Sequence, residues 1–427
     1  MMLIQAAWQT PRISDHCFKA PLGAHDCFHQ LKTVIGNVDL DSLRVQAEDK
    51  ARASAGRRIE ALGPLKNGSA SGNRERLAST IFGLLTSSRY RRGSIDYVRM
   101  AERRIHLQIS RAILRDEPIE FLLEFFAFKM RNKLRTFSRD GTEVDLSEAA
   151  TLLRLHEIAS AVKELYPPGA LMKVATDGTK FCGALETAPE TARAYARNLD
   201  ALAQALGVHR NVQFFDEADS FADDHAASTH HWYMRLRKEY ARSSDTPLAE
   251  TVVRFRNSMH FMLPLAADIP IDVVSRAFSK QIGDAQLRVL NPDAYHLRKD
   301  VECRALDATL RYIAVKKAAP RALQGIAPRA VLCCAHPRPG YLGLYVAGRG
   351  NTLFPHHSQG VFPGYGDNAS LDSIRMGYAA DIRRDPNCGS HLVGIVLPRL
   401  VYRFSNGVHP FAFVSSSSPA RTPFAML

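Results

Sequence analysis

The chain has 427 residues, of which 46% are hydrophobic and 23% charged, and its formal net charge is +13. These proportions are typical of a folded protein with a sizeable core and exclude a chain that is disordered throughout. No apolar run approaches the roughly 18 residues that a membrane-spanning helix needs. The positive excess, in which arginine dominates, favours anionic partners: nucleic acid, an acidic membrane surface, or metabolites that carry phosphate or carboxylate groups.

The seven cysteines are scattered along the chain and form no CxxC pair, which favours free thiols. The first 30 residues lack the charged-then-apolar pattern of a secretory signal. Together these features predict a cytoplasmic protein. A group of possible metal ligands near the start of the chain has spacings that fit no tetrahedral zinc site, so we predict no metal there; its members are His16, Cys17, His25, Cys27 and His29.

We predict that the first 75 residues form an accessory or poorly ordered segment, because Gly63 to Gly72 has the composition of a flexible linker. We expect order to begin near Arg76. Apolar residues at helical spacing then predict helices around 77–85 and 105–113, and the apolar, aromatic run over 119–128 predicts a buried strand.

Helix and strand alternate in the next part of the chain. One apolar stripe predicts a helix over 152–165, and a buried strand over 171–175 ends at the turn pair Asp177-Gly178. A capping-box pattern, Thr187 with Glu190, predicts the start of a helix that runs to Gly207, and a strand follows over 212–215. This alternation predicts an α/β fold with a Rossmann-like, mostly parallel sheet flanked by helices.

Beyond this unit, the pattern predicts an added helical block over about 227–317 and then a strand-rich part with strands at 331–335, 341–346 and 392–397. We therefore divide the chain into an accessory segment over 1–75, an α/β catalytic domain over 76–400 and a tail over 401–427. The oligomeric state is left open.

The common catalytic and cofactor motifs are missing, including the phosphate-binding P-loop, HExxH, GxSxG and the EF-hand loop. Gly364-Tyr-Gly-Asp-Asn-Ala369 formally matches a dinucleotide fingerprint, but it follows a loop-like Phe-Pro pair, which favours a surface turn. Cys333 and Cys334 lie in an apolar strand and predict buried packing. Because the common cofactor motifs are missing, we predict no cofactor. The basic segment over 89–135 is not accompanied by a recognisable nucleic-acid-binding module, so we predict no nucleic-acid partner.

Several short strings, in one order over roughly residues 76–365, resemble the isonitrile (isocyanide) synthases. Tyr166-Pro-Pro-Gly-Ala170 and Asp177-Gly-x-x-Phe181 are similar to the family's Tyr-Pro-Pro-Gly-Ala and Asp-Gly-x-x-Phe elements. The other strings that carry the resemblance are Ser88-Arg-Tyr-Arg-Arg92, Phe126-Ala-Phe-Lys-Met-Arg-Asn132, Asp145-Leu-Ser-Glu148, Ala335-His-Pro337 and Phe354-Pro-His-His-Ser358.

Some positions depart from the family pattern. Ala127 stands in place of a proline, Met130-Arg131 in place of Ser-Pro, Cys182-Gly183 in place of Ser-Asp, and His356 in place of a tryptophan. These departures leave open a non-catalytic member of the fold that binds a metabolite or a partner.

The resemblance implies an enzyme that converts the α-amine of an amino acid, tyrosine or tryptophan, into an isonitrile. The new carbon comes from C2 of ribulose 5-phosphate, and no metal or organic cofactor takes part. Arg91, Arg92 and Lys129 are then candidates to hold the phosphate dianion, with Lys129 also counted as catalytic.

Asp177, expected at the carboxyl end of a strand, is the candidate that orients or deprotonates the amine. His336 and His357 are candidates for proton transfer, because histidine titrates near working pH. Asn132, Phe181 and Ser358 complete the expected substrate site. Structural roles remain open for these residues, such as a turn for Asp177 or the end of a strand for His336.

Overall fold

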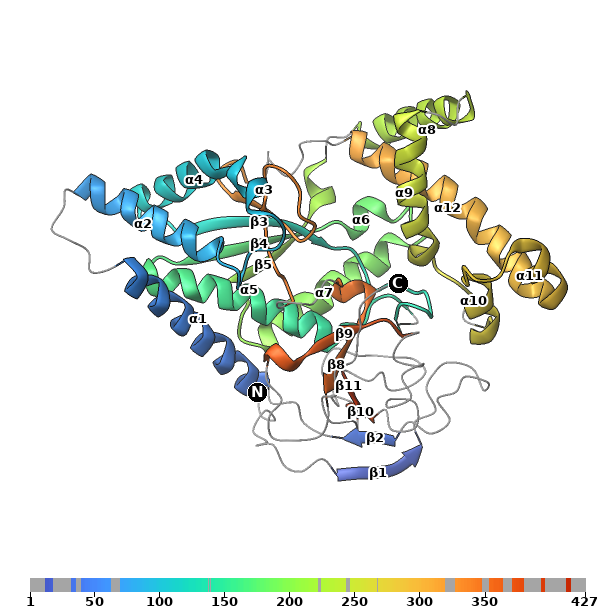
Figure 1. The fold of residues 1–427 in the computed structure, drawn as a ribbon, viewed down its shortest axis with the longest axis horizontal. Helices are drawn as coiled ribbons and strands as arrows, with labels where there is room; N and C mark the ends of the chain where they lie inside the picture. The colour runs from blue at the N-terminus through green and yellow to red at the C-terminus, as the bar shows by residue number, and fades with distance from the viewer. Residues whose placement is uncertain are drawn as a thin grey trace.

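The fold is known from a computed structural model (Figure 1), which describes residues 12–17, 32–35, 40–62, 70–136, 138, 140–221, 224–242, 246–266, 268–318, 327–347, 353–363, 371–379, 393–395 and 412–415. Its centre is a five-stranded sheet with strand order β5-β4-β3-β6-β7. Every neighbouring pair in this sheet is parallel. The strands are β3 (Ile119–Phe126), β4 (Ala170–Thr176), β5 (Val212–Asp216), β6 (Val331–Cys334) and β7 (Leu342–Gly343). The predicted α/β class with a parallel sheet is confirmed.

Helices connect the strands and cover the sheet. α5 (Leu146–Leu165) links β3 to β4 and α7 (Pro189–Ala205) links β4 to β5. α4 (Glu102–Arg115) lies on the opposite side of the sheet from α5 (Figure 1). It is preceded by α2 (Ala70–Leu85) and the short α3 (Ile95–Arg99). This arrangement follows from the parallel sheet, which needs a crossover between successive strands.

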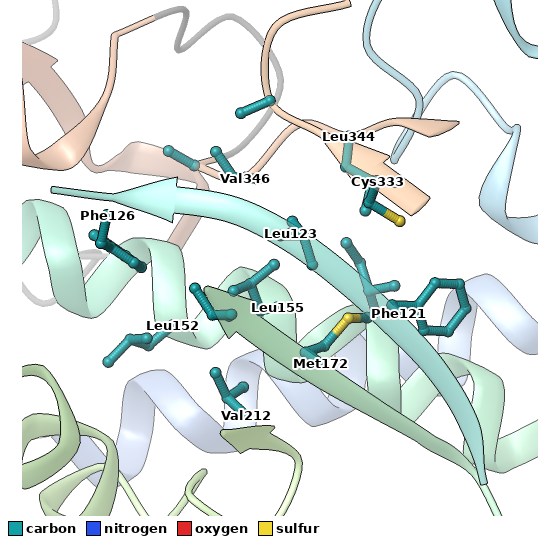
Figure 2. Close-up of a cluster of buried hydrophobic side chains, with 14 of the residues drawn as sticks. Phe121, Leu123, Phe126, Leu152, Leu155, Met172, Val212, Cys333, Leu344 and Val346 are labelled. Carbon is teal, nitrogen blue, oxygen red and sulfur yellow. The ribbon is translucent and has the colours of Figure 1, made fainter. Parts of the chain in front are cut away.

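The core lies between the sheet and α5, where Phe121 and Leu123 of β3 meet Met172 of β4 and Leu155 of α5 (Figure 2). Nearly all of α5 is buried, because α1 (Leu40–Leu62) packs against its outer side. The strongly apolar run of β3 reflects burial on both faces, as is typical of a central parallel strand.

A helical block stands at one end of the sheet (Figure 1). It consists of α8 (His225–Arg242), α9 (Pro247–Met262), α10 (Ile271–Ala277), α11 (Asp284–Leu290) and the long α12 (Pro292–Ala318). α8 and α9 pack against α12 around Leu236, Val252 and Ile313, which form a small core of their own. The predicted helical block is confirmed.

The strand-rich C-terminal part is also confirmed, and it includes a second, mixed sheet. Its strand order is β1-β2-β10-β11-β8-β9. The strands are β1 (Arg12–Cys17), β2 (Lys32–Ile35), β8 (Gln359–Pro363), β9 (Arg375–Gly377), β10 (Val393–Ile395) and β11 (Ala412–Ser415). This sheet therefore combines strands from both ends of the chain.

Three expectations about local structure were wrong. Order begins before Arg76, because α1 buries Leu43, Ala47 and Ala51 in the main core. The strand expected at 341–346 is only two residues long. Thr187 and Glu190 form no capping box: Pro189 begins α7 with its fixed backbone angle, and the Thr187 hydroxyl donates to the Leu185 carbonyl instead. The division into domains stays a prediction.

Other expectations concern single features. Cys333 and Cys334 are buried, as predicted. The possible metal ligands between His16 and His29 and the glycine string from Gly364 to Ala369 lie outside the residues whose side chains are described. Within the described residues, no group of three or more histidines, cysteines or acidic residues is placed to hold a metal. No described helix is both long and apolar enough to cross a membrane.

Candidate active site

A cavity of about 980 Å³ opens at the carboxyl ends of β3, β4 and β6. Because these strands are parallel, the residues that follow each one meet at the same edge of the sheet, where open α/β sheets bind ligands. Residues of α9, α12 and the segment 353–357 also line it. The lining includes Glu124, Asp177, Phe181, Arg254, Phe255, Tyr312, Lys316, His336, Arg338 and His357.

Asp177 follows β4 directly and faces this cavity, as its position in the sequence predicts. Its N–H donates to the carbonyl of Phe126 at 2.9 Å, which ties the ends of β3 and β4 together. Gly178 comes next because a Cβ there would lie 2.0 Å from the carbonyl oxygen of Ala127. Burial, and then the nearby charge of Glu124, raise the pKa of Asp177 to about 7.

Glu124 keeps its charge because a lysine pairs with it. Lys180 Nζ lies 3.2 Å from Glu124 Oε1 and 2.5 Å from Glu217 Oε1. Burial opposes ionisation of Glu124, but Lys180 and Lys316 outweigh it and lower the pKa of Glu124. Burial and the Glu124 charge raise the pKa of Glu217 to about 7. Glu124 is therefore a fixed negative charge beside Asp177.

Three cations line the same cavity as Asp177. Arg254 of α9, Lys316 of α12 and Arg338 after β6 line the cavity, and none forms an ion pair with a described residue. A fourth cation, Arg135, is held between two aromatic rings, with its guanidinium 4.3 Å from the centre of Phe261 and 3.9 Å from that of Tyr378. Such a lining suits a ligand that carries a phosphate or carboxylate group.

His336 and His357 also line the cavity, and their rings pack edge-on against Phe354 at 4.3 and 5.7 Å between ring centres. Burial and nearby cations lower the pKa of His336 to about 4 and that of His357 to about 3. Both imidazoles are therefore neutral at pH 7. In that form each can accept a hydrogen bond at one ring nitrogen and donate one from the other.

Lys129 lies beneath the cavity with a fully buried side chain. Its ammonium group is 2.9 Å from carboxylate oxygens of both Asp145 and Glu148, and it donates to the carbonyl of Pro355 at 2.9 Å. Asp145 and Glu148 also form a capping box at the start of α5. Lys129 thus connects α5 to the turn that carries His357, and it does not line the cavity.

Of the remaining predicted site residues, one lines the cavity and the others lie outside its lining. Phe181 lines the cavity. The Ser358 hydroxyl donates to the Phe354 carbonyl at 2.7 Å, and the Asn132 side chain accepts from the N–H of Leu134 at 3.0 Å; both brace turns. Arg91 and Arg92 do not line the cavity, although the charge of Arg92 acts on His336. The Arg92 N–H donates to the Gly343 carbonyl in β7, and Arg91 forms an isolated β-bridge with Leu344 just after it.

Several residues that line the cavity were not predicted as site residues from the sequence. Glu124 is a charged residue inside an apolar strand, and Arg338 follows His336-Pro337 closely, so both could have been found. Three other lining residues lie on helices whose sequence is typical of a solvent-exposed charged face. They are Arg254, Tyr312 and Lys316. Only the packing of α9 and α12 over the sheet edge brings them to the cavity.

Comparison with known proteins agrees with this fold. A sequence profile of the pyoverdine/dityrosine biosynthesis protein family matches residues 109–317, just under half of the chain. The L-tryptophan isonitrile synthase AmbI2 of Fischerella ambigua is 27% identical over 108 residues, which are 25% of this chain and 32% of that protein. Isocyanide synthase A of Aspergillus fumigatus is 25% identical over 135 residues, which are 31% of this chain and 22% of that protein. Over part of its length, the chain is therefore similar to isonitrile synthases.

The crystal structure of the PvcA protein from Pseudomonas aeruginosa has the same fold, with a TM-score of 0.53 and 17% identity; the match covers 79% of this chain and 99% of that one. The part of the chain that matches the pyoverdine/dityrosine family profile includes Lys129, Asp177 and Lys316. The matched part spans about a third or less of the length of these two curated synthases.

Proposed function

We propose that the protein is an isonitrile synthase-like enzyme, a carbon–carbon lyase that needs no cofactor. It would convert the α-amine of tyrosine or tryptophan into an isonitrile, with ribulose 5-phosphate as the carbon donor. The observation that carries this proposal is Asp177, whose pKa is raised to about 7 at the end of β4, in a cavity that is also lined by Arg254, Lys316 and Arg338. Burial is the main cause of this shift. A carboxyl group with this pKa can take a proton from a substrate ammonium group and return it to a leaving oxygen.

The two substrates match two parts of the cavity lining, one cationic and one aromatic. The sugar phosphate dianion suits Arg254 and Arg338, which have no ion pair with a described residue. An aromatic amino-acid side chain suits the face where Phe181 stacks on Tyr312 at 4.3 Å and Phe255 lies 5.6 Å from the same ring.

In the proposed reaction Asp177 first removes a proton from the amino-acid ammonium group, so that the amine can attack the ketone of the sugar. Dehydration and carbon–carbon cleavage then need protons to be delivered to and removed from oxygen atoms. Neutral His336 and His357 can relay these protons, because each ring carries one acceptor and one donor nitrogen.

A non-catalytic, metabolite-binding protein of the same fold is the second candidate. Lys129 belongs to a string that resembles the synthases. However, its ammonium group is buried, pairs with two carboxylates and does not line the cavity, so it cannot contact a ligand there. The departures at Ala127 and Cys182 point the same way.

Mass spectrometry separates the two candidates. The purified protein is incubated with ribulose 5-phosphate that carries carbon-13 at C2 and with tyrosine or tryptophan, and a tetrazine captures any isonitrile. The proposal predicts a captured adduct that contains the labelled carbon. If folded protein binds ribulose 5-phosphate in calorimetry but yields no adduct with either amino acid, the metabolite-binding function stands instead.

A further inference from the structure

Lys316 is the one described lysine that lines the cavity. It lies in the last turn of α12, and its ammonium nitrogen is 4.6 Å from the ring centre of Tyr312 and 5.9 Å from that of Phe181. No hydrogen bond or ion pair joins its side chain to a described residue. The amine is therefore held on an aromatic surface and faces the space where a ligand would bind.

The other lysines near the cavity are engaged. Lys129 is held by Asp145 and Glu148, and Lys180 by Glu124 and Glu217. An ammonium group in such a pair stays protonated and has no lone pair to offer. Of these three lysines, only Lys316 has the freedom to act as a nucleophile.

The surroundings also favour the neutral amine of Lys316. Burial is the main effect and lowers its pKa, and the charges of Lys180 and Arg338 act in the same direction, although Glu124 and Asp177 oppose them. A desolvated lysine beside other cations is the usual setting for an amine that attacks a carbonyl carbon. Asp177, whose charge acts on Lys316, has the pKa of a group that can give and take protons during such an attack.

We propose that Lys316 is a catalytic residue that forms an imine with the ketone carbon of the sugar phosphate. This inference rests on the proposed function for its substrate, but it adds a covalent step in which the protein takes part. The lone pair of Nζ forms a bond to C2, the ketone oxygen takes a proton and Nζ loses one, which gives a neutral carbinolamine. The hydroxyl group then takes a second proton and leaves as water, which gives a protonated imine, an iminium group.

The imine can pass the sugar to the amino acid without any oxidant or reductant. The neutral α-amine adds to C2 of the iminium group and its nitrogen then loses a proton, which Nζ takes up. The bond between C2 and Nζ breaks, and Lys316 returns as a free amine. An iminium carbon is more electrophilic than a ketone, so this exchange speeds the attack by a weakly nucleophilic amine. Arg254 and Arg338 stay available to hold the phosphate while Lys316 is neutral.

The test is reductive trapping. The whole protein is incubated with ribulose 5-phosphate, sodium borohydride is added, and the intact mass is measured. We expect a gain equal to the sugar phosphate less one oxygen atom, located on Lys316 by peptide mapping. Lys316→Arg keeps the positive charge but cannot form the imine, so this variant should lose the adduct and the isonitrile. Lys317→Arg is the matched control, because that neighbouring side chain stacks on Trp232 and does not line the cavity.

The possible results distinguish this inference from the proposed function. Labelled isonitrile without an adduct on Lys316, or an adduct that persists in a folded Lys316→Arg variant, overturns the imine and leaves the enzyme assignment standing. An adduct on Lys316 without any isonitrile supports the imine and removes the assignment as an isonitrile synthase. Circular dichroism confirms that each variant is folded.

Discussion

At the residue scale, Asp177 is the group on which the proposed chemistry depends. Its pKa of about 7, caused by burial and by the charge of Glu124, means that the carboxylate form becomes dominant as pH rises through neutrality. The reaction rate should therefore rise with pH across this range. Asp177→Asn should lower the rate by about 100-fold or more, since a positioned general base contributes about that much. Initial rates of isonitrile capture between pH 5.5 and 8.5 test this.

The same variant has a second effect that separates loss of activity from loss of structure. A carboxyl whose folded-state pKa is raised binds its proton more tightly in the folded state, so it lowers stability as pH rises from its unfolded pKa to about 7. Asp177→Asn removes this cost. We expect its urea midpoint to exceed that of the unsubstituted protein at pH 8, and to exceed it by less at pH 5. Equal differences at both pH values would contradict the raised pKa.

Lys129 gives a contrasting prediction at the same scale. Lys129→Met leaves the buried carboxylates of Asp145 and Glu148 without their counter-ion. The loss should lower the free energy of unfolding by about 3–5 kcal/mol, as expected when one partner of a buried ion pair is removed. Urea unfolding measures it, with exposed Lys163→Met as the control. A stable Lys129→Met variant without activity would instead favour the directly catalytic role predicted from the sequence.

At the element scale, the close approach of α6 (Gly178–Phe181) to the end of β3 keeps Asp177 in place. In Gly178→Ala the new methyl group would collide with the Ala127 carbonyl. We expect a loss of about 1–3 kcal/mol of stability, as for other overpacked sites, together with weaker activity. Gly183→Ala is the control, because no atom lies within 4 Å of a Cβ at that position. Similar urea midpoints for the two variants would show that the contact does not matter.

The elements also show what a single sequence can predict. Apolar runs and turn signals located β3 and β4 closely, because burial on both sides leaves few choices of residue. They also located β5 and the end of α5, although α5 begins at Leu146 and not at the predicted position 152. The same reasoning missed α1, where small alanines rather than a stripe of large apolar residues make the contact with α5. It also predicted a capping box at the start of α7, where there is none, while the capping box at the start of α5, formed by Asp145 and Glu148, was not predicted.

At the scale of the whole molecule, α1 belongs to the folded unit. Ala51→Asp would place an unpaired charge between α1 and α5 and should lower the free energy of unfolding by about 3 kcal/mol or more. Ala53→Asp is the matched control, because Ala53 is exposed on the same helix. Equal stabilities would mean that α1 does not pack as described. The comparison needs only urea unfolding followed by circular dichroism.

The cavity joins parts of the chain that lie far apart, and this limits what its sequence can reveal. Asp177, His336 and His357 could be predicted, because each follows a recognisable strand or family-like string. Lys316 and Arg254 could not, since their place at the cavity depends on how the helical block packs over the sheet edge. The phosphate candidates suggested by the strings, Arg91 and Arg92, lie outside the cavity lining for the same reason.

The central claim is that this cavity makes an isonitrile, and capture of the labelled product tests it most directly. The unsubstituted protein, Asp177→Asn and the surface variant Arg329→Ala are incubated with C2-labelled ribulose 5-phosphate and tyrosine or tryptophan. We predict labelled adduct from the unsubstituted protein and from Arg329→Ala, and almost none from Asp177→Asn. Equal amounts from all three would contradict the role of Asp177, and no adduct from any folded protein would contradict the assignment as an isonitrile synthase-like enzyme.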